Sequence, residues 1–181
     1  IYYHEQDYQN ALEHYKYAEN WLNLANPSYY YHYTMSSYHT GLIENSLKTL
    51  KHLILNINDI PEINDARYLI ADYSIENKDY KNGIEIILSI ESNQRKDKDY
   101  IYLSKLYKLT NDSLKEKEAL MHIQEKDIQM LRRLAILHEQ THDKIMSKYT
   151  WEELVKLEKT DEYKAYALFS LANIAYDEHE F

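Results

Sequence analysis

Only two glycines and two prolines interrupt this chain of 181 residues. Tight hairpin turns and short strand-to-helix loops depend on these two residue types, because glycine accepts a positive φ and proline fixes φ near about −65°. Their scarcity argues against an all-β fold and against a glycine-rich phosphate-binding loop. It predicts a chain built of helices, with asparagine and aspartate at the joints between them.

Composition and charge exclude several function classes. The chain has no cysteine, which rules out disulfides, thiol catalysis, iron–sulfur clusters and cysteine-ligated zinc. Its net charge of −9 argues against a nucleic-acid partner and against a basic membrane-surface helix. No apolar run approaches the roughly 20 residues of a membrane span. With no signal peptide visible, we expect a cytoplasmic location, and the absence of a starting methionine suggests a piece of a longer array.

Small residues recur at intervals of 31 to 37 residues, and this spacing predicts a repeated pair of helices. A small side chain is needed where two helices cross closely, and a large one fills the space beside the crossing. The small sites in the first helices are Thr34, Ala71, Ser104, Ala135 and Ala172. The small sites in the second helices are Ala11, Ser46, Gly83 and Ser147, and the large sites are Tyr15, Leu50, Ile87 and Trp151.

The pattern predicts ten helices joined by short linkers, so that neighbouring helices pack antiparallel. One pair departs from the pattern, because Glu116 occupies a position where a small residue is expected and Ala119 follows three residues later. Either that pair is irregular or its second helix is shifted along the chain. The predicted helices cover residues 6–24, 28–40, 43–57, 63–76, 80–91, 98–109, 113–125, 127–140, 143–158 and 162–178.

The turns Gln6-Asp7-Tyr8 and Lys78-Asp79-Tyr80, together with the small-residue register, resemble the tetratricopeptide repeat (TPR) family. That family is built from helix–turn–helix units of about 34 residues. The resemblance implies an all-α, right-handed superhelical solenoid of about ten antiparallel helices, forming a single domain over residues 1–181. The approximate repeats are 1–26, 28–58, 62–93, 98–126, 127–160 and a partial repeat at 161–181.

The resemblance also implies a function, since the first helices of TPR proteins line a concave groove that binds a peptide or a partner helix. We therefore expect a non-enzymatic scaffold for a protein or peptide ligand, without a cofactor, and a homo-oligomer is left open. The groove positions that the register assigns are Tyr31, Met35, Tyr38, Tyr68, Asp72, Lys105, Lys108, Arg132, Glu139, Tyr166, Phe169 and Asn173.

The densest aromatic patch lies at residues 29–38 and bears directly on that groove. In a helix, Tyr31, Met35 and Tyr38 lie on one side, while Tyr30 and Tyr33 turn toward the core. Exposed tyrosine and methionine suit a contact surface, because they offer a large area at low entropic cost. The alternative is that the 20 tyrosines of the chain mainly replace leucine and phenylalanine in the repeat core.

A second interpretation makes the chain the sensor portion of an intracellular peptide-responsive regulator. The run from Tyr2 to Tyr8, with Ala18-Glu19, Ser37-Tyr38-His39 and Ser46-Leu47, is similar to the TPR portion of Rap/PlcR-type regulators. Those proteins carry an effector region before their repeats. An upstream helix-turn-helix or helical bundle would distinguish this interpretation from a plain scaffold.

A third interpretation rests on His138-Glu139-Gln140-Thr141-His142, which matches the H-E-x-x-H pattern of zinc hydrolases. In those enzymes both histidines share one helix face and bind zinc, and the glutamate is the general base. Glu162 would be the third ligand. The repeat register instead favours a packing position for His138 and a position in the inter-helix turn for His142.

Overall fold

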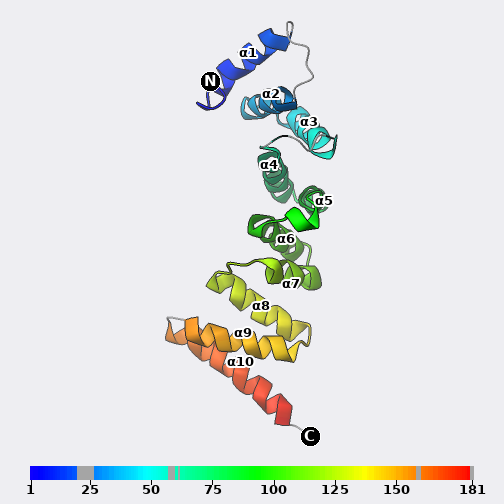
Figure 1. Cartoon of the computed structure of the whole chain (residues 1–181). Helices are drawn as coiled ribbons and strands as arrows, with labels where there is room; N and C mark the ends of the chain where they lie inside the picture. Colours follow the sequence, from blue (N-terminus) through cyan, green and yellow to red (C-terminus); the bar gives the residue numbers. More distant parts are fainter. Residues whose placement is uncertain (20–26, 57–59, 61, 158–159, 180–181) are drawn as a thin grey trace. The chain divides into compact units, whose positions relative to one another are not determined.

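The computed structural model describes residues 1–19, 27–56, 60, 62–157 and 160–179. Within these residues it has ten α-helices and no strand (Figure 1), which confirms the all-α prediction. The chain divides into two compact units, residues 1–91 and 92–181. The first unit holds α1 (Tyr8–Glu19), α2 (Pro27–His39), α3 (Ile43–Asn56), α4 (Ile63–Glu76) and α5 (Tyr80–Leu88). The second holds α6 (Asp97–Leu109), α7 (Ser113–His122), α8 (Ile128–Gln140), α9 (Lys144–Leu157) and α10 (Asp161–His179), after a short 3-10 turn at Ser92–Gln94.

Within each unit, every helix packs on the helix that follows it in the chain. The first unit contains the contacts α1–α2, α2–α3, α3–α4 and α4–α5, and the second contains α6–α7, α7–α8, α8–α9 and α9–α10. Short connections and amphipathic faces produce this arrangement, since each helix buries its apolar face on its nearest neighbours in sequence. The assignment of residues 1–181 to a single domain stays a prediction.

The turn inside each helix pair is built in the same way. One residue in each turn has a positive φ. The backbone N–H of the next residue donates to the carbonyl five positions before that next residue, at 2.8–3.0 Å. This is the usual way in which a helix ends in a left-handed residue. The five left-handed residues are Gln6, Gly41, Lys78, Asn111 and His142. They are spaced by the same 31 to 37 residues as the small sites, so the turns carry the predicted repeat.

Aspartate begins the second helix at four of these five turns. The carboxylates of Asp7, Asp79, Asp112 and Asp143 each accept a hydrogen bond from the backbone N–H three residues later, at 3.2–3.5 Å. Such a cap pairs a donor that the helix itself cannot satisfy. Leu42 takes the equivalent place after Gly41 and has no side-chain acceptor.

The equivalent turns also show whether the helix that contains Glu116 is shifted along the chain. The backbone N–H of Glu116 bonds to the carbonyl of Asp112 at 2.9 Å, as that of Gly83 bonds to Asp79 and that of Ser147 to Asp143. Helix α7 is therefore not shifted, and Glu116, which is 2% exposed, occupies the small-residue site.

Helix bounds agree with the predicted ranges except at a few ends. Helix α7 stops at His122 rather than at 125, because Ile123 is extended and the next two backbone N–H groups bond to the Asp97 carboxylate at 3.0 Å. Helix α5 stops at Leu88, three residues before its predicted end. The predicted ends at 24, 57 and 158 lie outside the described residues. No described helix is long and apolar enough to span a membrane.

Candidate functional site

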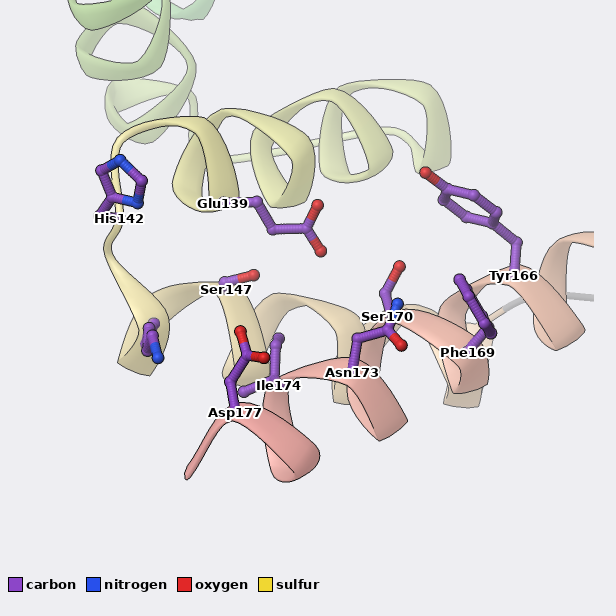
Figure 2. A pocket seen from close by; sticks show the side chains of 10 residues that line it. Glu139, His142, Ser147, Tyr166, Phe169, Ser170, Asn173, Ile174 and Asp177 are labelled. Carbon is purple, nitrogen blue, oxygen red and sulfur yellow. The ribbon is translucent and has the colours of Figure 1, made fainter. Parts of the chain in front are cut away.

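A hollow of about 300 Å³ lies in the second unit, where α8, the start of α9 and α10 come together (Figure 2). Helix α10 supplies most of its lining through Tyr166, Phe169, Ser170, Asn173, Ile174 and Asp177. The remaining lining residues are Glu139 at the end of α8, His142 in the turn, and Lys144 and Ser147 at the start of α9.

The orientation of α10 follows from its buried residues. Ala167 and Ile174 pack with Trp151 and Leu154 in one apolar cluster. At about 100° per residue, Phe169 lies on the side of the helix away from Ala167, and Tyr166 lies at the border of the buried face. Tyr166 is 52% exposed and Phe169 62% exposed at the edge of the hollow. Burial of one face of α10 therefore leaves these two aromatic side chains exposed beside that face.

A hydrogen bond to the core fixes the carboxylate in the middle of the hollow. The indole Nε1 of Trp151 donates to Glu139 Oε1 at 2.7 Å. Trp151 is 1% exposed, and its ring meets the Tyr166 ring edge to face at a centroid distance of 5.5 Å. The core side chain thus positions both a charged and an aromatic lining residue.

The two ends of the hollow differ in chemistry. Figure 2 shows Tyr166 and Phe169 at one end and His142 and Asp177 at the other, with Glu139 between them. Two carboxylates and one amine, Lys144, are the charged groups of the described lining. The arrangement offers aromatic stacking area at one end, a carboxylate acceptor in the middle and a second carboxylate at the other end.

Two of the predicted groove residues are buried, which corrects their assignment. Tyr31 is 1% exposed and Met35 is 6% exposed, and both belong to the apolar core of the first unit with Leu50 and Ile54. Their side of α2 faces the interior, while Tyr30 and Tyr33, predicted to face the core, are only partly buried. The predicted stripe of Tyr31, Met35 and Tyr38 is therefore not an exposed surface.

The other predicted groove residues retain some exposure. Tyr38, Tyr68 and Asp72 lie on α2 and α4 of the first unit, and Asp72 is exposed. Lys105 is exposed on α6, and the Arg132 guanidinium lies 3.5 Å from the centre of the Tyr163 ring. The hollow includes four of the predicted groove positions, Glu139, Tyr166, Phe169 and Asn173. Their role in binding stays a prediction.

Part of the aromatic patch at residues 29–38 packs α2 against the chain before it. The Tyr29 hydroxyl donates to the Tyr15 carbonyl at 2.5 Å, and the Tyr3 ring centre lies 4.3 Å from that of His32. Burial raises the pKa of Tyr3 to about 12, so its phenol stays neutral near pH 7. These contacts between tyrosine and histidine rings join residues far apart in the chain, so the spacing of the sequence does not predict them.

The structure does not bring the three candidate zinc ligands together. Helix α8 ends two residues before His142, whose φ of 56° takes it out of the helix, so His142 does not share a helix face with His138. His138 is fully buried, whereas Glu162 is exposed in the first turn of α10. Within the part of the chain that the structure describes, no three His, Asp or Glu side chains are grouped to hold a metal ion.

Two further hollows of about 380 and 420 Å³ occur, one in each unit. Three polar side chains of the first hollow are engaged with one another. Lys51 Nζ donates to Asn82 Oδ1 at 2.6 Å, and the Asn82 amide donates to Ser74 Oγ at 2.8 Å. The second lies between α7, α8 and α9 and includes the buried His138. Neither presents aromatic side chains from two exposed positions of one helix, as the α10 hollow does.

Comparison with known proteins identifies the fold. Neither protein-family models nor curated sequences match the chain. Among solved structures, a double mutant of MamA from RS-1 is 13% identical, with a TM-score of 0.56 over 97% of this chain and 89% of its own. MamA from residue 41 to its end, from Desulfovibrio magneticus RS-1, is 16% identical, with a TM-score of 0.55 over 85% and 87%. A kinesin light chain protein of Podosopora anserina, with nearly identical TPR-like repeats, is 10% identical, with a TM-score of 0.53 over 88% and 92%.

The fold is that of the tetratricopeptide repeat. In TPR terms, α8 and α10 are first helices of successive repeats and α9 is the second helix between them. The hollow therefore lies between first helices, where the register places a groove. Asp177 was missed by sequence reasoning, although it follows the predicted groove residue Asn173 by four positions and so lies on the same helix face.

Proposed function

We propose that this chain is a non-enzymatic scaffold that binds a protein or peptide segment in the hollow between α8 and α10. The observation that carries the proposal is the pair Tyr166 and Phe169, which are held more than half exposed on a helix whose opposite face is buried. Aromatic side chains at contact surfaces supply much of the energy of an interface.

The polar lining supports the same proposal. Asn173 offers an amide that donates and accepts, and Glu139 offers a carboxylate already held by Trp151. A mixture of aromatic anchors and fixed polar groups suits recognition of a polypeptide. The peptide-sensor interpretation would use the same surface, and it stays a prediction, as do homo-oligomerisation and a cytoplasmic location.

The test is to pan a displayed library of random twelve-residue peptides against the whole chain. Affinities of enriched peptides can be read from the emission of Trp151 in a Trp21→Phe background, which leaves one indole. Phe169→Ala should weaken binding about tenfold or more, as expected for an aromatic anchor. Tyr176→Ala is the matched control, because Tyr176 is 66% exposed on the same helix and does not line the hollow. Equal affinities of the two variants would count against the proposal.

A further inference from the structure

We infer that the segment bound in the α8–α10 hollow carries a lysine or arginine side chain beside an aromatic or aliphatic one. The inference rests on the proposed function and adds the chemistry of the partner. It follows from the unequal distribution of charge and aromatic surface along the hollow, and from the way in which the core fixes that distribution.

The acidic part of the hollow is preorganised. Glu139 Oε1 accepts the indole hydrogen of Trp151 at 2.7 Å, and no other hydrogen bond of the Glu139 carboxylate is found among the described residues. Its second oxygen is therefore available to a donor in the hollow. Charge-assisted hydrogen bonds to a carboxylate held in place lose less entropy than those to a mobile surface side chain.

Asp177 adds a second carboxylate at the end of the hollow away from the two rings, one turn beyond Asn173 on α10 (Figure 2). Lys144 is the one amine of the described lining. The local charge thus favours a cation, and the net charge of −9 for the whole chain acts in the same direction. An acidic segment would meet two carboxylates, which is unfavourable at an interface.

The aromatic part of the hollow determines which kind of side chain neighbours the lysine or arginine of the bound segment. Tyr166 and Phe169 lie at the end opposite Asp177. The arginine or lysine must then be followed or preceded by an apolar side chain that covers these rings. Burial of exposed aromatic surface gives affinity, whereas the carboxylates select the partner and make its binding sensitive to salt.

The peptide panning described above distinguishes this inference from the proposed function. We expect enriched peptides to contain lysine or arginine near an aromatic or aliphatic residue. Glu139→Gln and Asp177→Asn, which keep side-chain size, should each lower the affinity for such peptides about two- to fivefold and reduce the salt dependence of binding. Glu152→Gln is the control, because it removes the same charge from an exposed site of α9 outside the hollow.

The possible results separate the further inference from the proposed function. Enriched peptides that are acidic or uncharged, and whose binding depends on Phe169, would overturn the inference and leave the proposed function standing. The same holds if Glu139→Gln and Asp177→Asn bind as tightly as Glu152→Gln. A library that yields no peptide dependent on Phe169 would overturn both.

Discussion

The Arg133 guanidinium in α8 holds the Glu116 carboxylate of α7 in a two-bond pair. Arg133 Nε donates to Oε1 at 2.7 Å, and Nη2 donates to Oε2 at 2.6 Å. Glu116 fills a position that holds a small residue in the other second helices, and it is buried there. The pair raises the pKa of Arg133 through the hydrogen bonds to Glu116. A departure from the repeat pattern is thus compensated by an ion pair between neighbouring repeats.

Glu116→Gln should lower the free energy of unfolding by about 2–4 kcal/mol, because it leaves a partly buried guanidinium without its charged partner. Urea denaturation measures the change, with the exposed Glu118→Gln on the same helix as the control. The double variant Glu116→Ala/Arg133→Met should recover much of the loss, since alanine restores the small side chain. A loss for Glu116→Gln no larger than for Glu118→Gln would show that the pair does not stabilise the fold.

His138 should make stability depend on pH. Its side chain is fully buried, with Nδ1 3.3 Å from Asp143 Oδ2, Lys117 on α7 near the same carboxylate, and Glu153 of α9 in the adjoining hollow. Burial lowers the pKa of His138 below its ordinary value of 6.5, and the nearby Asp143 carboxylate opposes this only in part. Folding therefore favours the neutral imidazole.

Because the pKa is lower in the folded state, the stability from neutral His138 is fully present above pH 6.5. It should be lost as the pH falls below that value toward the lowered pKa. The free energy of unfolding, measured between pH 7.5 and 5, should fall less steeply for His138→Gln than for the unchanged chain. His52→Gln, at an exposed site of α3, should keep the original slope. Burial also lowers the pKa values of His32 and His39. The variants and the unchanged chain all retain these two histidines, so their contribution cancels when the pH slopes are compared.

Lys78→Gly should raise the free energy of unfolding by about 1 kcal/mol. Lys78 has a φ of 60°, which strains any residue with a Cβ and suits glycine, as at the equivalent Gly41. Lys48→Gly, at an exposed position inside α3, should instead lose about 1 kcal/mol, because glycine weakens a helix interior. Thermal or urea unfolding of both variants gives the sign of each change in the free energy of unfolding. A lower free energy of unfolding for Lys78→Gly would contradict the proposed strain.

Tyr31→Ala should lower the free energy of unfolding by about 3 kcal/mol or more, since it removes a ring from the core of the first unit. Tyr38→Ala should cost clearly less, because Tyr38 is only partly buried. Urea titrations with far-UV circular dichroism provide the comparison. Similar small losses for both would mean that Tyr31 is not the core residue described above.

Much of the candidate site follows from the repeat register, but not the choice of faces on every helix. On α10 the register positions Tyr166 and Phe169 are exposed, and their role in binding stays a prediction. The register fails on α2, where tyrosines at 29, 30, 31, 33 and 38 occupy several sides of the helix. A helix that is aromatic on several sides has no single apolar face, so its sequence does not indicate which side is buried.

The sequence by itself determined the all-α class, the repeat spacing and the register of the helix pairs, because small residues and turn residues act locally and recur. Tertiary structure decided which tyrosines are covered, since burial depends on the helices that stand on either side of α2. It also decided that Glu116 pairs with Arg133 and that Trp151 positions Glu139. Those contacts join different helices through long side chains, whose partners are set by packing and not by their spacing along the chain.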